Sequence, residues 1–219
     1  MDRTAFLRQV RGELRGTRAP ERPPAWPATP ASGSARGPAA VLAFLEALAG
    51  VGGVGRAVAR QALAAAVTAA AAALPEGAGR TAVVAPDTDA WREAIDAGLA
   101  AAGVEPVRPA PDGWREAAAA AGMGITSAAL GVASTGSVLI VPGPNTPRVA
   151  GLLPEAHLVL LPADQLVPGL EEAMPVLASL ADRSSAPVLV TGPSRTSDIE
   201  MVTVFGAHGP RRLEVLLIG

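Results

Sequence analysis

The stretch that decides the fold is Pro187-Val188-Leu189-Val190-Thr191-Gly192-Pro193-Ser194-Arg195-Thr196-Ser197-Asp198-Ile199-Glu200. An apolar, β-branched run ends at Thr191, where Gly192-Pro193 interrupts it, which predicts a buried strand followed by a tight turn. Ser197 and Glu200 have capping-box spacing, so we expect a helix to begin there and to cover 198–205. Open α/β sheets bind ligands where such strands end, at their carboxyl ends.

The loop of this stretch is rich in groups that bind anions. It offers backbone N–H groups, hydroxyls and the guanidinium of Arg195, which suit a phosphate or a carboxylate. An ordinary turn whose Ser and Thr only cap a helix uses the same residue types, so both interpretations stay open. The residues that we predict to bind a ligand here are Thr191, Gly192, Ser194, Arg195, Thr196, Ser197 and Asp198.

Upstream of this stretch, strand and helix patterns alternate. Thr81–Ala85 and Val104–Arg108 read as strands, with a helix over Asp89–Ala102 between them, and this order predicts a mainly parallel sheet covered by helices. Two further strand patterns, Ala129–Ala133 and Ser137–Val141, flank Ser134-Thr135-Gly136, which predicts one hairpin. The other expected strands are 54–58, 157–161 and 213–218, and the other expected helices are 2–16, 38–49, 60–74, 114–121 and 165–181.

The first 37 residues differ in composition from the rest of the chain. A short amphipathic helix is followed by a segment rich in Pro, Ala and Arg, and the region holds seven arginines and three acidic residues, a net charge of +4. We therefore predict an arm and linker over 1–37 and one α/β domain over 38–219. Docking on the body or on a partner is the expected role of the helix.

Composition excludes several classes of function. The chain has no cysteine and only two histidines, so it supplies neither thiolates for an iron–sulfur cluster nor a multi-histidine metal centre. A net charge of -2 gives no indication of nucleic-acid binding. No leader peptide is predicted, because residues 1–16 alternate arginines with apolar residues. No membrane span is predicted either, because the Ala-rich stretch at 57–74 carries Arg60 and Gln61. We expect a cytoplasmic protein. We expect no cofactor and no metal in this chain.

A glycine-rich motif, Gly50-Val51-Gly52-Gly53-Val54-Gly55, matches the dinucleotide fingerprint in letters only. That fingerprint must follow a strand, whereas the preceding segment has a helical pattern. We interpret it as a connection between elements.

Several spaced motifs resemble a known family. They are Gly124-Ile125-Thr126, Ser134-Thr135-Gly136-Ser137, Arg148 ahead of Leu152-Leu153-Pro154 and His157, Val167-Pro168, Thr191–Glu200 and Gly206-Ala207-His208-Gly209-Pro210. In this order they resemble the lactate utilization protein C family, which carries the LUD domain. The resemblance implies a three-layer α/β fold of the NagB/RpiA/CoA-transferase type, with a mainly parallel sheet and one hairpin. It also implies a role in L-lactate oxidation to pyruvate beside iron–sulfur partner proteins.

Residues outside the 191–198 loop are further candidates for a site. His208, just before the last strand, is our candidate general base or anion donor, although a histidine at a turn also hydrogen-bonds backbone. Asn145 and Arg148 could orient a carboxylate, and Thr135 and Gly136 could line the same cleft. We predict one cleft shared by the 191–198 loop, the 143–148 loop and the His208 turn. His157 is expected to be a core histidine.

Two kinds of function remain open from the sequence. The first is an accessory component that binds a small anion while iron–sulfur partners carry the electrons of lactate oxidation. The second is a stand-alone enzyme of the sugar-phosphate isomerase, CoA-transferase or folate-cycloligase type, which rests on fold analogy. Transfer of CoA through an acyl-glutamate needs a positioned carboxylate, and the hairpin carries Ser134 where the family often has an acid. A third possibility, an adaptor with a basic arm, is consistent with the charge of residues 1–37.

Overall fold

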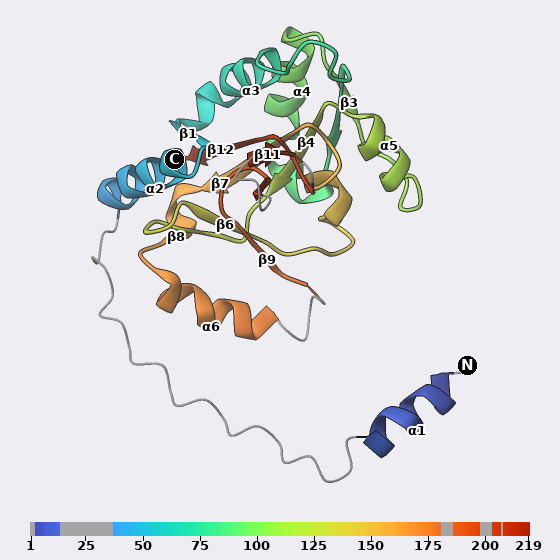
Figure 1. Ribbon diagram of the computed structural model, residues 1–219. Helices are drawn as coiled ribbons and strands as arrows, with labels where there is room; N and C mark the ends of the chain where they lie inside the picture. The colour runs from blue at the N-terminus through green and yellow to red at the C-terminus, as the bar shows by residue number, and fades with distance from the viewer. Residues whose placement is uncertain (1–2, 14–36, 181–185, 198–202, 207) are drawn as a thin grey trace. The chain divides into compact units, whose positions relative to one another are not determined.

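The structure is a computed structural model that describes residues 3–13, 37–180, 186–197, 203–206 and 208–219 (Figure 1). The chain divides into two compact units, Met1–Pro30 and Ala31–Gly219. In the first unit the described element is α1 (Arg3–Glu13), on which Phe6 and Leu7 are exposed. The boundary between residues 37 and 38 stays a prediction, and the predicted linker falls largely outside the described residues.

The second unit is built on a six-stranded parallel sheet, which confirms the predicted fold class. Its strand order is β1-β12-β7-β4-β2-β3, and every neighbouring pair is parallel. The long strand β7 is a nearly continuous apolar run, as expected for a strand that is buried on both faces. The strands are β1 (Val54–Val58), β2 (Thr81–Val84), β3 (Glu105–Val107), β4 (Met123–Ser127), β7 (Ala156–Pro162) and β12 (Arg212–Ile218).

Helices α3 and α4 cover one face of this sheet, and a second layer covers the other (Figure 1). That second layer contains α2, α5 and a small four-stranded sheet of order β8-β5-β6-β9, whose outer face packs on α6. The remaining elements are α2 (Pro38–Gly50), η1 (Arg60–Ala62), α3 (Leu63–Ala72), η2 (Pro86–Trp91), α4 (Arg92–Ala101), α5 (Trp114–Ala120), β5 (Leu130–Val132), β6 (Ser137–Ile140), η3 (Arg148–Gly151), η4 (Ala163–Gln165), β8 (Leu166–Val167), α6 (Leu170–Leu180), β9 (Val188–Val190), β10 (Arg195–Ser197) and β11 (Thr203–Phe205).

The predicted hairpin is confirmed, and it forms the centre of the small sheet. β5 and β6 pair antiparallel, and β6 pairs antiparallel with β9 on its other side. The strand at 188–190 is therefore an edge strand of the small sheet and is not part of the parallel sheet. This placement moves the loop that follows it away from the carboxyl edge where we expected it.

Two element predictions are wrong, and one strand was not predicted. The helix predicted to begin at Ser197 is replaced by an antiparallel pair, β10 with β11, and residues 198–202 lie outside the described residues. Thr203-Val204-Phe205 is β-branched and aromatic, a composition that favours strands over helices. β4 was not predicted, because its alternation of Gly124 and Thr126 hides an otherwise buried strand. The helix expected from Gln165 begins at Leu170, after β8 pairs with β5.

Candidate functional site

Three hydroxyl groups form a hydrogen-bonded chain where β6 begins and β9 ends. Thr135 Oγ1 lies 2.7 Å from Ser137 Oγ, which lies 2.7 Å from Thr191 Oγ1. The antiparallel register that pairs Val138 with Val190 brings these two strand ends together. Ser137 is buried and Thr191 is exposed, so the hydroxyl chain runs from the interior to the surface.

The carboxyl end of α2 closes one side of these hydroxyls. Gly136 has a φ of 64°, and a Cβ there would clash with the backbone of Leu48. Gly192 has a φ of 81°, and its own Cβ would lie 2.7 Å from the carbonyl oxygen of Val51. Both positions therefore require glycine, for their conformation and for the close approach of backbone. The glycine-rich stretch after α2 leads into β1, which agrees with its interpretation as a connection.

Arg195 and the 208–210 turn join the same cluster. The Arg195 guanidinium donates a hydrogen bond to the carbonyl oxygen of Val51, and its side chain is exposed. The backbone N–H of Ser194 donates to the carbonyl of Pro210 at 2.9 Å. A Cβ on Gly209 would lie 3.4 Å from Ser194 Cβ, so the turn that carries exposed His208 packs directly on the 191–195 loop.

We name this group the hydroxyl cluster: Thr135, Gly136, Ser137, Thr191, Gly192, Ser194, Arg195 and the 208–210 turn. It lies at the amino edge of the parallel sheet, because Pro210 and Arg211 lead into β12 and Val51 lies ahead of β1. Hydroxyls beside an arginine and an exposed histidine provide donors for a small anion. Asp198 lies outside the described residues, and Thr196 and Ser197 belong to β10.

The 143–148 loop does not join this cluster. It follows β6, whereas the 191–195 loop follows β9, and antiparallel strands end at opposite ends of their sheet. The carbonyl of Asn145 instead accepts a hydrogen bond from the backbone N–H of Asp87 at 3.0 Å, and Arg148 begins η3 with an exposed side chain. The predicted single cleft is therefore divided between two edges of the main sheet.

Asp87, which the sequence analysis did not identify, is the centre of a second group of polar residues, at the other edge of the main sheet. Its Oδ2 accepts hydrogen bonds from Thr146 Oγ1 at 2.7 Å and from the backbone N–H of Ser127 at 3.2 Å. Its Oδ1 is buried without a hydrogen-bond partner among the described residues. Burial raises the pKa of Asp87, although the hydrogen bonds from Thr146 and Ser127 oppose this shift.

Asp87 lies at the topological switch point of the parallel sheet. It follows β2, whose chain continues outward to the edge strand β3, and it contacts Ser127 at the end of β4, whose chain continues the other way. Ligands of open α/β sheets bind at such points. Its position directly after a predicted parallel strand was the signal in the sequence that would have found it.

His157 is the core histidine that we expected. It is buried in β7, and its Nε2 lies 2.8 Å from Thr126 Oγ1. Gly151 packs on its ring, where a Cβ would lie 2.7 Å from Cε1. Burial lowers the pKa of His157 to about 4, so the ring is neutral at pH 7. Among the described residues no group of three His, Asp or Glu could hold a metal ion.

The fold is a mixed α/β domain that is known from a solved structure. A protein of the DUF162 family from Deinococcus radiodurans, solved at 1.70 Å, has a TM-score of 0.57 with this chain at 22% identity. The match covers 82% of this chain and 96% of the other. The LUD domain family model matches residues 83–218, which include both clusters from Asp87 to Pro210, and the chain belongs to the LUD domain family.

Curated relatives match part of the chain. A lactate utilization protein C of Deinococcus radiodurans is 33% identical over 96 residues, 43% of this chain and 45% of the relative. Another from Exiguobacterium is 34% identical over 112 residues, 49% of each chain. A third, from Bacillus subtilis, is 30% identical over 102 residues, 45% of this chain and 42% of the relative. The chain spans about half the length of the curated relatives that it matches.

Proposed function

We propose that this chain is a component of an L-lactate utilization system, in which it binds a small anion at the hydroxyl cluster. The observation that carries the proposal is the similarity, at 30–34% identity, to several proteins named lactate utilization protein C. Membership of the LUD domain family agrees with it.

The proposal includes partner proteins that carry the electrons. Oxidation of lactate to pyruvate releases two electrons, and a chain without cysteine supplies no thiolate to an iron–sulfur cluster. Iron–sulfur proteins of the same system would therefore accept them. No helix in the described part of the chain is long and apolar enough to cross a membrane.

The chemistry of the hydroxyl cluster supports an anionic ligand. A carboxylate such as that of lactate accepts hydrogen bonds from hydroxyls and from a guanidinium, and an α-hydroxyl group pairs with a second hydroxyl. Thr191 and Arg195 are the exposed members that a ligand could reach, with Ser137 behind them.

Growth and reconstitution test the proposal. Deletion of the gene, in a strain with no other lactate dehydrogenase, should abolish growth on L-lactate and leave growth on pyruvate unchanged. The purified chain should reduce no dye with lactate until iron–sulfur partners from the same cell are added. Normal growth of the deletion strain would contradict the assignment to lactate utilization. Dye reduction by the pure chain would contradict the need for iron–sulfur partners.

Calorimetry of the purified chain tests the site. Titration with L-lactate and with inorganic phosphate should show binding that Thr191→Val and Arg195→Ala weaken. Arg115→Ala, which removes an exposed arginine of α5, should leave the affinity unchanged. Equal affinities for all four proteins would exclude the hydroxyl cluster.

A further inference from the structure

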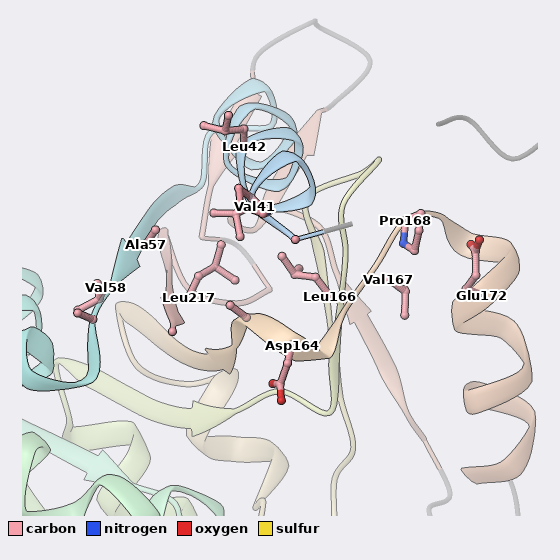
Figure 2. Close-up of a pocket in the computed structure, with 15 residues that line it drawn as sticks. Val41, Leu42, Ala57, Val58, Asp164, Leu166, Val167, Pro168, Glu172 and Leu217 are labelled. Atoms are coloured by element: carbon pink, nitrogen blue, oxygen red, sulfur yellow. The ribbon is translucent and has the colours of Figure 1, made fainter. Parts of the chain in front are cut away.

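A groove of about 1050 Å³ opens at the carboxyl edge of the parallel sheet, away from the hydroxyl cluster (Figure 2). Its residues follow or end three parallel strands: Val58 and Ala59 at β1, Leu217 and Gly219 at β12, and Asp164 after β7. The opposite walls come from α2 and from β8. The carboxyl edge of a parallel sheet is where α/β folds bind small ligands, and their pockets have volumes of about 300–1,000 Å³.

The walls of the groove are apolar. Val41 of α2, Leu166 of β8 and Leu217 of β12 face one another across it (Figure 2). Leu42, also on α2, is 63% exposed, the highest value among the exposed leucines of the described residues. A ligand that covers these side chains gains the free energy of removing apolar surface from water.

The charged groups that line the groove are all acidic. Asp164 is exposed, and Glu172 is half-buried at the start of α6, where its Oε2 accepts a hydrogen bond from the backbone N–H of Gly169 at 3.1 Å. Among the described residues that line the groove there is no arginine. Arg60 follows Ala59 but does not line it. An anion such as lactate would meet only carboxylates here, which repel it.

We propose that this groove is a second binding site, which takes a small molecule with an apolar chain and a positively charged head. The apolar chain lies between α2 and β8, and the cation lies at the acidic rim, where Asp164 and Glu172 stand apart from each other (Figure 2). This ligand differs in charge and polarity from the anion of the hydroxyl cluster, so the two sites accept different molecules.

Alkyl probes of one chain length and opposite charge test the site. Titration of the full chain with octyltrimethylammonium, below its micelle concentration, should saturate and should perturb residues of α2 and β8 in NMR spectra. Octyl sulfate should bind at least tenfold more weakly. Neutralising the rim with Asp164→Asn and Glu172→Gln together should remove most of that difference, and Gln retains the acceptor for Gly169.

Variants separate the groove from unspecific binding to apolar surface. Ala57→Trp fills the groove from an exposed position of β1 and should weaken octyltrimethylammonium at least tenfold, as should Leu42→Asn if the tryptophan variant does not fold, because asparagine removes apolar surface without adding a charge that attracts the cation. Met174→Asp changes a 51% exposed residue of α6 outside the groove and should change nothing. Absence of saturable binding, equal binding of the two probes, or an equal effect of Met174→Asp would overturn the proposal. If the groove bound a peptide of a partner protein but neither alkyl probe, that result would overturn the proposal as well.

Discussion

The guanidinium of Arg195 hydrogen-bonds to the carbonyl oxygen of Val51, a residue 144 positions earlier in the chain. Val51 lies at the carboxyl end of α2, where backbone carbonyls lack helical partners and the helix dipole attracts a cation. One side chain thus has a structural partner and also belongs to the proposed anion site.

For Arg195 we therefore predict two separate losses. Arg195→Ala should weaken binding of L-lactate or phosphate by about 1.5–3 kcal/mol, as expected for a charged hydrogen bond, and should lower the free energy of unfolding by about 1 kcal/mol. Calorimetry and urea denaturation measure the two effects. Arg195→Lys keeps the charge at the end of α2 and should recover more of the stability than of the binding. Full recovery of both would contradict a role that needs the guanidinium geometry.

A second prediction concerns Gly136. Because φ is 64° and a Cβ would clash with the backbone of Leu48, Gly136→Ala should destabilise the fold by about 3 kcal/mol. Gly143→Ala is the matched control, since nothing lies within 4 Å of its Cβ, and it should change the free energy of unfolding by less than about 0.5 kcal/mol. Thermal unfolding of both variants measures this difference. Similar midpoints would contradict the prediction and would show that α2 can move to make room for a Cβ at position 136.

The third prediction concerns pH and His157. The folded-state pKa is lowered to about 4 from an ordinary value of 6.5, so between these values the unfolded chain binds more protons than the folded one. Stability should therefore fall as the pH falls from 6.5 to 4, by on the order of 3 kcal/mol from this residue. The profile of His157→Gln should lack this part of the decline, whereas His208→Gln, which changes an exposed side chain, should retain it. Parallel profiles for His157→Gln and the parent would contradict a neutral buried ring.

For Asp87 the sign is opposite. Its pKa is raised by burial, so the stability that the protonated form contributes is lost as the pH rises through the folded-state pKa. Asp87→Asn keeps an oxygen for Ser127 and Thr146, and its stability relative to the parent should increase as the pH rises from 3 to 8. Asp87→Ala also lacks the titrating carboxyl, so its difference from the parent should follow the same pH dependence, but it leaves both donors unpaired and should be less stable than Asp87→Asn by about 1–3 kcal/mol at every pH. Denaturation across this range measures the free energy of unfolding of both variants. A constant difference between Asp87→Asn and the parent would show that burial does not shift the pKa of the Asp87 carboxyl.

Local signals in the sequence were sufficient for most single elements. Alternating strand and helix patterns predicted the parallel sheet, Ser134-Thr135-Gly136 predicted the hairpin, and the position of His157 at the start of an expected strand predicted its burial. These inferences succeed because hydrophobic periodicity and turn residues act over a few positions. The same reasoning failed at 197–205, where a capping-box spacing competed with β-branched residues and the strand pairing prevailed.

The placement of the site was decided by tertiary structure alone. Whether the strand at 188–190 joins the parallel sheet or the small sheet depends on its pairing with β6, a contact between residues about 50 positions apart. That pairing puts Thr191 and Arg195 beside α2 at the amino edge, and it sends Asn145 to Asp87 at the other edge. The sequence by itself determined which residue types are available for an anion, a core and a groove. Long-range strand pairing decided which of them meet, because backbone hydrogen bonds between strands carry no mark in either strand's own composition.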